Sequence, residues 1–160
     1  MYFIAEIGVN HEANLKKAFK CIKDAKEGGA QAVKFQCYKA EKIASKYAGA
    51  YWDKKEESEN SQLKLYKKFD KFGFKDYEKI ISYCKKLKID FIITPFDVDT
   101  INYFKTRVKY FKISSSDITN LPLLEKIADT RKPVILSTGA STKKEIQNAY
   151  KILNRKSKKI

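Results

Sequence analysis

Short apolar runs alternate with amphipathic stretches along the whole chain, and this alternation limits the possible folds more than any other feature. Each apolar run suits a buried strand, and each amphipathic stretch carries apolar residues at helical spacing. The expected strands are residues 2–8, 32–36, 90–96, 109–116 and 133–139. The expected helices lie near residues 15–27, 61–70, 75–88, 98–105, 121–129 and from 142 onward, with a long loop at 37–60. Such alternation predicts a parallel sheet of the α/β class.

Two arrangements of a parallel sheet fit this pattern. One is a doubly wound open sheet, and the other is a TIM (β/α)8 barrel. A complete barrel takes about 250 residues, whereas this chain has 160 and holds about five strand–helix units. If the fold is a barrel, we therefore expect a partial barrel.

Glycine and capping residues mark the ends of two expected helices. Gly28 and Gly29 should end the first helix, because glycine accepts the backbone conformation found after a helix. Thr142 and Glu145 have the spacing of a capping box, in which each side chain bonds the backbone of the other residue. The last helix should therefore begin directly after Thr142.

The composition indicates a soluble globular protein with an anionic partner. Apolar residues make up 43% of the chain and charged residues 33%, and the formal net charge is +15. The partner could be nucleic acid or a small anionic substrate, but the lysines are spread through almost every segment, as on solvated helix faces. No apolar run is long enough to span a membrane, and no signal peptide is expected. Three cysteines without metal-ligand spacing suggest a reduced, cytoplasmic location.

Polar residues gather where the expected strands end. The carboxyl ends of parallel strands meet at one edge of the sheet, where binding sites lie in such folds. We therefore expect one shared site at this edge. Its candidate residues are Glu6, Asn10, His11, Lys34, Gln36, Thr94, Asp97, Lys112, Ser114, Ser115, Ser116, Asp117, Ser137 and Thr138.

The chemistry of this set suits a small polyanion. Two lysines, several hydroxyls and backbone N–H groups can hold a phosphate ester that also carries a carboxylate. Glu6 stands among apolar strand residues, where a carboxylate needs a cationic partner or a ligand. Other members of the set also have an ordinary explanation: a strand lysine can sit at a sheet edge, a serine can cap a helix, and His11 can lie in a surface loop. No phosphate-binding glycine motif is present.

Five segments resemble the sialic acid synthase family in order and spacing. They read AEIGVNHEANL, AVKFQCYKAEKI, FIITPFD, KYFKISSSDITNLPLLEKIA and KPVILSTGAS. The resemblance implies an amino-terminal TIM barrel followed by an antifreeze-like domain. Residues 1–160 would then be the amino-terminal part of the barrel, without the later strands and the second domain. It also implies a homodimer in the complete enzyme, in which the antifreeze-like domain reaches the partner's site.

The resemblance also implies a reaction and a set of roles. These enzymes condense phosphoenolpyruvate with an N-acetylated amino sugar, commonly N-acetylmannosamine, to give a nine-carbon 2-keto acid and phosphate. Glu6 would be catalytic, and Asn10 and His11 would shape the sugar end. The remaining candidates are substrate-binding: Lys34, Lys112, Ser115 and Ser137 for phosphoenolpyruvate, with Gln36, Thr94 and Asp117 as further pocket residues. A divalent metal, Mn²⁺ or Mg²⁺, would activate the sugar aldehyde.

Departures from the family pattern leave alternatives open. Cys37, Ala140 and Ser116 stand where the family usually has Thr, Met and Gly. The family's metal ligands are histidines on later strands, and His11 is the sole histidine here, so the ligands are not expected in this chain. The alternatives are a non-catalytic fragment that needs a second chain and another barrel synthase that uses phosphoenolpyruvate. Nucleic-acid binding would need basic and aromatic residues clustered on one face, and we expect neither a nucleic-acid nor a membrane partner.

Overall fold

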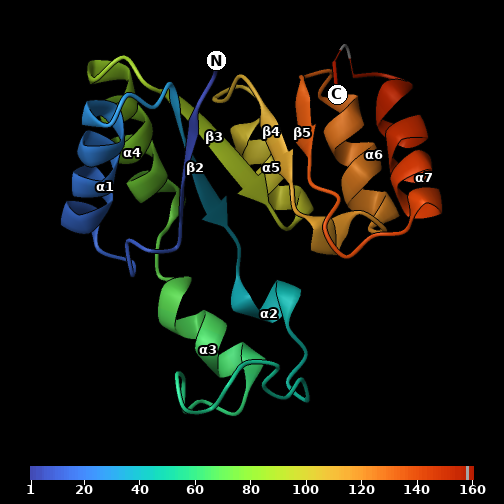
Figure 1. The fold of residues 1–160 in the computed structure, drawn as a ribbon, viewed down its shortest axis with the longest axis horizontal. Helices are drawn as coiled ribbons and strands as arrows, with labels where there is room; N and C mark the ends of the chain where they lie inside the picture. The colour runs from blue at the N-terminus through green and yellow to red at the C-terminus, as the bar shows by residue number, and fades with distance from the viewer. Residues whose placement is uncertain (158) are drawn as a thin grey trace.

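The computed structural model describes residues 1–157 and 159–160, and within them five parallel strands form one sheet in the order β1-β2-β3-β4-β5 (Figure 1). A doubly wound sheet would reverse its strand order at a switch point and carry helices on both faces. Here the order follows the sequence without reversal, which is the order of a barrel. The strands are β1 (Ile4–Gly8), β2 (Ala32–Cys37), β3 (Asp90–Pro95), β4 (Phe111–Ile113) and β5 (Val134–Leu136).

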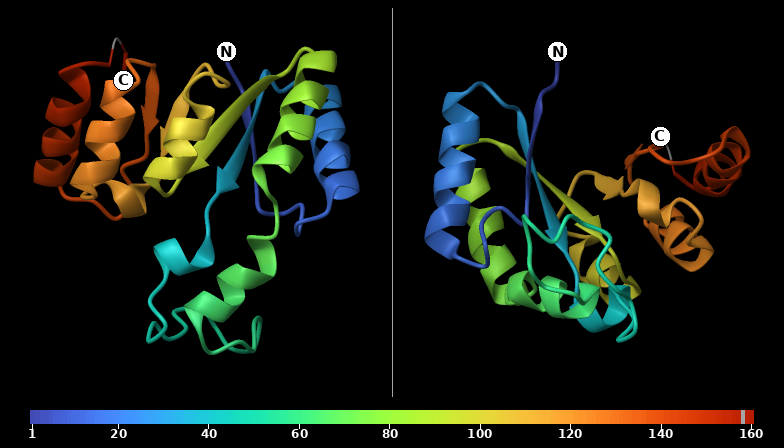
Figure 2. Two further views of the ribbon diagram at one scale, coloured as in Figure 1. Left: turned by 180° about the vertical axis from the view of Figure 1, so that it is seen from behind. Right: turned by 60° about the horizontal axis from the view of Figure 1, so that its bottom comes forward.

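Most helices lie along the outer side of the curved sheet (Figure 2). The outer helices are α1 (Leu15–Glu27), α4 (Phe74–Lys86), α5 (Val98–Phe104), α6 (Leu121–Asp129) and α7 (Lys143–Asn154). Two further helices, α2 (Ala40–Ile43) and α3 (Gln62–Phe69), form an excursion between β2 and α4, beyond the carboxyl end of β2 (Figure 1). A single 3₁₀ turn, η1 (Ser115–Asp117), follows β4. The fold is thus the partial TIM barrel that the alternation allowed.

Alternate residues of the strands divide the sheet into two chemically different faces. In β2, Val33, Phe35 and Cys37 belong to the core between the sheet and the outer helices. Lys34 and Gln36 point the opposite way, because side chains alternate along a strand. This opposite face is the interior face of the partial barrel, so the polar residues of the strands line its interior.

The structure differs from the sequence-based expectation in the later strands and in the long loop. β4 and β5 have only three residues each. β4 ends at Ile113 because the serines after it turn into η1 instead of extending the strand. The segment 37–60 contains α2 and an isolated bridge between Gly49 and Ser61. The expected limits of two helices are confirmed: Gly28 caps α1, and Thr142 and Glu145 form the capping box of α7.

Candidate functional site

A lysine–carboxylate pair occupies the interior face between the first two strands. Glu6 of β1 lies opposite Lys34 of β2 in the parallel register, and their Nζ and Oε2 atoms are 2.7 Å apart. The pairing shifts between Glu6 and Gly8, and such an irregularity bends a strand. The chain therefore turns away directly after its carboxylate.

The burial of Glu6 differs from the sequence-based expectation. The Glu6 side chain is 60% exposed, whereas the Lys34 side chain is only 6% exposed. The expectation that Glu6 is buried was wrong, because β1 is the first strand of the sheet and its interior face is open. Lys34 lies on β2, between two neighbouring strands, so the alternative of an edge lysine with its amine in solvent is also wrong. A buried ammonium group is costly without a partner, and Glu6 supplies that partner.

A second lysine adds positive charge to the same site. Lys112 of β4 is half-buried, and its Nζ donates to the Ile113 carbonyl at 2.9 Å. Burial lowers the pKa of Lys112, the charge of Lys34 lowers it further, and the charge of Glu6 opposes the shift. The three charges are thus coupled across the interior face. We call Glu6, Lys34 and Lys112 the charged cup; it holds two ammonium groups and one carboxylate, which leaves an excess of positive charge.

Gln36 and Thr94 lie on the same face, one step nearer the carboxyl end of the sheet. They are paired in the register of β2 and β3. Thr94 is 1% exposed, and its hydroxyl has no hydrogen-bond partner among the described residues. Buried polar groups are normally satisfied, so this unpartnered hydroxyl is an exception among the buried groups of the interior face.

The turns after β4 and β5 bring two more candidates together. The Ser137 N–H donates to the Ile113 carbonyl at 3.1 Å, which continues the pairing of β4 and β5. A Cβ atom placed on Gly139 would lie 3.5 Å from the Ser115 hydroxyl, an ordinary contact distance. Ser115 therefore lies against the turn that begins at Ser137. Hydroxyls and backbone N–H groups in such turns can bind anions.

Asp117 is engaged in the turn that leads into α6. Its Oδ1 accepts a hydrogen bond from the Asn120 side chain at 3.1 Å, and Asn120 caps α6. Burial raises the pKa of Asp117, and its Oδ2 is unpartnered within the described part of the chain. The contacts that the structure gives Asp117 are therefore local to this turn.

Asn10 and His11 lie in the turn after β1, and the His11 ring packs on the outer core, away from the interior face that carries the charged cup. Asn10 is exposed in the turn after β1. His11 is buried; its Nδ1 accepts from the Ala13 N–H at 3.0 Å, and its ring stacks on Phe72 at 4.4 Å. It also contacts Phe35, a residue of the outer core. The alternative that His11 lies in a surface loop was thus wrong, since its ring packs against the core and holds the β1–α1 loop.

A pocket of about 380 Å³ lies at the carboxyl end of the sheet, under the α2–α3 excursion. We call it the aromatic pocket. Its lining is Val9, Gln36, Tyr38, Ile43, Tyr51, Leu65, Tyr66, Phe69, Phe96, Ser114 and Ser116. Sequence reasoning found Gln36 and the serines but missed the aromatic and aliphatic walls, because residues 37–60 have no clean period. The aromatic residues of that segment and of α3 were the available signal.

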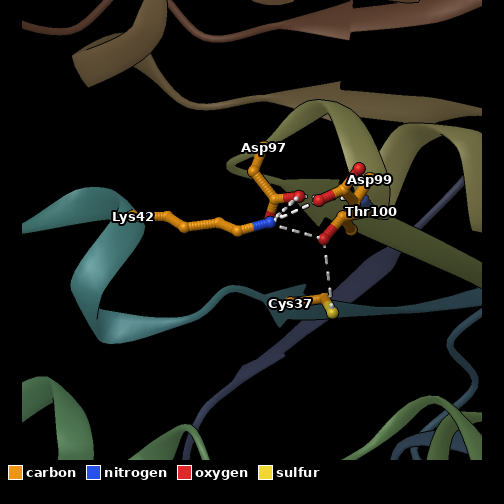
Figure 3. A network of polar contacts seen from close by, with 5 residues as sticks. All are labelled: Cys37, Lys42, Asp97, Asp99 and Thr100. Atoms are coloured by element: carbon orange, nitrogen blue, oxygen red, sulfur yellow. Dashed lines mark hydrogen bonds and ion pairs between the residues drawn. The ribbon is translucent and has the colours of Figure 1, made fainter.

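A second group of charges holds the excursion in place. Lys42 of α2 contacts Asp99 at 2.6 Å and Asp97 at 3.3 Å (Figure 3). Asp97 also accepts hydrogen bonds from the N–H and hydroxyl of Thr100, both at 2.9 Å, and so caps α5. The Thr100 hydroxyl lies 3.9 Å from the sulfur of Cys37. We call Lys42, Asp97 and Asp99 the latch, since it joins α2 to the start of α5.

The Cys37 thiol and the arrangement of possible metal ligands limit the chemistry of the described residues. Burial raises the pKa of the Cys37 thiol to about 11, which keeps it protonated and weakly nucleophilic at neutral pH. Residues 1–157 and 159–160 contain no cluster of three or more His, Cys, Asp or Glu side chains that could hold a metal ion. No described helix combines the length and the apolar character needed to cross a membrane.

Comparisons with known proteins agree with this geometry. The profile of the NeuB family matches residues 21–160. The N,N'-diacetyllegionaminic acid synthase of Campylobacter jejuni subsp. jejuni is 40% identical over 153 residues, which are 94% of this chain and 46% of that protein. The crystal structure of an N-acetylneuraminic acid synthetase from Leptospira borgpetersenii in complex with citrate shares 36% identity, with a TM-score of 0.82 over 97% of this chain and 50% of that one.

A more distant structure supports the fold alone. A truncated 3-deoxy-D-arabino-heptulosonate 7-phosphate synthase from Thermotoga maritima matches 97% of this chain and 47% of its own, with a TM-score of 0.67 and 15% identity. The chain spans about half the length of these proteins. Since the family profile covers most of the sequence, the chain belongs to the NeuB family of sialic, legionaminic and pseudaminic acid synthases and corresponds to the amino-terminal part of its longer members.

Proposed function

We propose that this chain supplies the amino-terminal part of an active site that condenses phosphoenolpyruvate with an N-acylated amino sugar. The products are a nine-carbon 2-keto sugar acid and phosphate. The observation that carries the proposal is the charged cup, in which two ammonium groups outnumber one carboxylate on the interior face. Phosphoenolpyruvate carries a phosphate and a carboxylate, and both are anions that a pair of lysines can hold.

The lysines would bind and orient the donor. Lys34 and Lys112 lie on strands separated by β3, so they can hold the two anionic ends of one small molecule. The hydroxyls of Ser115, Ser137 and Thr94 would add neutral donors. Held in this way, the phosphoenolpyruvate is oriented so that its C3 can attack the aldehyde carbon of the sugar.

Glu6 would act on the acceptor side. Its carboxylate is open to the barrel interior and is held by Lys34 at 2.7 Å, so it can accept a hydrogen bond from a sugar hydroxyl or take part in proton transfer. The carbon–carbon bond forms from C3 of phosphoenolpyruvate, water adds at C2, and phosphate leaves by C–O cleavage. A divalent ion would polarise the aldehyde in the complete enzyme. The described residues do not gather a donor set that fits such an ion, so no step here passes through it.

Direct titration of the chain tests this function. We expect phosphoenolpyruvate to bind at least tenfold more tightly than either inorganic phosphate or pyruvate, because each of these carries only one of the two anionic groups. Isothermal titration calorimetry at low and high salt would measure all three affinities. Equal affinity for the three anions would contradict the proposal, since it would show that the lysines do not act as a pair.

One alternative has its own support. The chain spans 46% of its Campylobacter relative, and β1 and β5 are the two edges of the sheet. An isolated chain would then bind phosphoenolpyruvate without turnover and need a second chain that completes the barrel. Light scattering of the purified chain, together with an assay for released phosphate, separates the two cases. Turnover by a monomer would remove this alternative.

A further inference from the structure

The β1–α1 loop, residues 9–14, adopts a backbone that its own sequence does not favour. Glu12 and Ala13 have φ angles of +48° and +54°, in the left-handed region that residues with a Cβ atom enter only at an energetic cost. Hydrogen bonds inside the loop close short turns, such as the one from the Asn14 N–H to the His11 carbonyl at 2.8 Å. A strained backbone of this kind persists only where surrounding contacts hold it.

His11 supplies such contacts from within the loop. It is the one residue of 9–14 that is buried. Its Nδ1 accepts a hydrogen bond from the N–H of Ala13 at 3.0 Å, and its ring stacks on Phe72, with centroids 4.4 Å apart and planes 2° apart. The Phe35 ring lies 5.6 Å away. Loss of the His11 side chain would therefore leave the strained loop without its buried support.

This anchor lies beside the register irregularity of β1. Glu6 is paired with Lys34. The next paired residue of β1 is Gly8, which faces Phe35, so two residue steps on β1 match one step on β2. The His11 ring packs on the same Phe35. The Gly8 carbonyl lies close enough to the His11 ring to oppose the lowering of its pKa by burial. His11 thus contacts the point at which β1 departs from regular pairing.

Little else fixes the Glu6 carboxylate. Its side chain is 60% exposed and β1 is an edge of the sheet, so the carboxylate follows the position of the backbone. Its ionic partner within the described part of the chain is Lys34 Nζ, at 2.7 Å. A shift of the backbone after Glu6 would lengthen this contact and weaken it, because the attraction between charges falls with distance.

We propose that His11 is a positioning residue that fixes the backbone after Glu6 and so holds the Glu6 carboxylate against Lys34. The His11 ring packs on the outer core, so it acts through Glu6 and does not touch a ligand on the interior face. The effect on anion binding rests on the proposed function, since it assumes that anions bind at the lysines. The effect on the ion pair itself does not depend on any ligand.

The ammonium signal of Lys34 tests this inference without a ligand. The protons of a buried, paired ammonium group exchange slowly with water, and ¹⁵N NMR can follow them; the signal of Lys34 is the one lost in Lys34→Met. We expect His11→Ala to raise their exchange rate about tenfold, as Glu6→Gln should, while the amides of β2 and β3 keep their protection. If the Ala13 amide becomes labile but the Lys34 signal does not change, the inference is wrong.

Two aromatic substitutions keep the test decisive if His11→Ala does not fold. Phe72→Leu removes the ring on which His11 stacks and should raise the Lys34 exchange rate about threefold. Tyr83→Leu is the matched control, because it removes a half-buried ring of α4 that packs on Phe19 at 4.7 Å instead, and it should leave the rate unchanged. Equal effects of these two substitutions would overturn the inference.

A double-mutant cycle shows whether His11 acts through Glu6 when an anion binds. The affinity for inorganic phosphate is measured by ³¹P NMR in the unaltered chain, in His11→Ala, in Glu6→Gln and in the double variant. We expect His11→Ala to raise the affinity about threefold, since the displaced carboxylate competes less for Lys34, and to change nothing further once Glu6 is replaced. The same change in both backgrounds would contradict the inference, because it would be independent of Glu6.

The same variants separate the two proposals. If Lys34→Met binds phosphoenolpyruvate as tightly as the unaltered chain while His11→Ala still speeds the exchange of Lys34, the proposed function fails and the positioning role stands. If phosphoenolpyruvate binds at the lysines but His11→Ala leaves the exchange of Lys34 unchanged, the positioning role fails and the proposed function stands.

Discussion

The charged cup and the latch are both built from lysines and carboxylates, yet they have opposite charge balances. The charged cup has two ammonium groups and one carboxylate, and its Lys34 side chain is 6% exposed. The latch has one ammonium group and two carboxylates, and its Lys42 side chain is 42% exposed. The surplus negative charge of the latch is already met by the Thr100 N–H and hydroxyl. The surplus ammonium group of the cup, that of Lys112, donates to one neutral acceptor, the Ile113 carbonyl, and has no carboxylate of its own among the described residues.

This difference shows how a candidate binding site can be distinguished from a structural ion pair. A lysine–carboxylate contact alone is weak evidence, because exposed pairs of this kind contribute little to stability. What distinguishes the charged cup is an excess of one sign, held partly buried on an interior face beside an unpartnered hydroxyl, Thr94. Electrostatic interactions are stronger in such a place than in water.

The largest expected effect comes from removing the buried lysine of the charged cup. Lys34→Met keeps the side-chain length but removes the charge, and we expect a loss of about 100-fold in affinity for phosphoenolpyruvate, since charged hydrogen bonds are the strong ones. Isothermal titration calorimetry would measure the loss. Lys42→Met, in the latch, is the matched control and should leave this affinity unchanged. A similar loss in both variants would erase the distinction between the two regions.

The next largest effect is on the pH dependence of stability, and it follows from comparing two buried ionisable groups, one with a carboxylate partner and one without. Lys34 has Glu6 at 2.7 Å, whereas the buried ring of His11 faces Phe72 and Phe35. Burial lowers the pKa of His11 from 6.5 to about 4. In the unfolded chain His11 is protonated below about pH 6.5, whereas in the folded chain its ring stays neutral until about pH 4. Between these two values the unfolded state binds more protons, so the free energy of unfolding falls as the pH falls.

We expect the protonation of His11 in the unfolded chain to lower the free energy of unfolding by about 2 kcal/mol between pH 7 and pH 5. Urea unfolding at both pH values would measure it, and His11→Phe should remove that part of the pH dependence while it keeps an aromatic ring against Phe72. If His11→Phe shows the same dependence as the unaltered chain, carboxylates elsewhere are responsible.

Removing the carboxylate of the charged cup should have a smaller effect, and it should strengthen anion binding instead of weakening it. Under the proposed function, Glu6 and the bound anion compete for the Lys34 ammonium group, which Glu6 contacts at 2.7 Å. Glu6→Gln removes the competing charge at constant shape, so we expect affinity for inorganic phosphate to rise about fivefold. Phosphate binding followed by ³¹P NMR would show the change. Weaker binding in this variant would mean that Glu6 positions Lys34 more than it competes with the ligand.

The smallest effect concerns the latch itself. Lys42→Met should raise the hydrogen-exchange rates of α2 amides about threefold, because local opening becomes easier when an exposed tether is lost. The affinity for phosphoenolpyruvate should not change. Unchanged exchange in α2 would show that the contacts of Asp70 alone hold the excursion.

Much of the fold was predictable because it depends on local periodicity. The strand and helix pattern, the glycine end of α1 and the capping box of α7 follow from residues that are close in sequence. β4 and β5 were both predicted too long. For β4 the reason is that the serines after Ile113 form a 3₁₀ turn instead of continuing the strand. The α2–α3 excursion has no simple period, so its helices and the aromatic pocket beneath it were not predicted.

The sequence predicted which residues belong to the candidate site better than it predicted their burial and orientation. Because side chains alternate between the two faces of a strand, Lys34 and Gln36 of β2 lie on the same face. The position of His11 was not predictable, because the turn after β1 directs its ring toward Phe72, a residue far along the chain. The burial of Lys34 and the exposure of Glu6 depend on which strands flank each residue, and sequence spacing does not contain that information.

By itself, the sequence determined the alternation of strands and helices, the α/β class, and the clustering of polar residues at the strand ends. These properties depend on side-chain period and on chain direction, which are local. Only the tertiary structure decided that the sheet follows the strand order of a barrel, that Glu6 faces Lys34, and that the excursion closes an uncharged pocket beside them. Register, burial and the coupling of charges come from residues that are distant in sequence and meet only when the chain is folded.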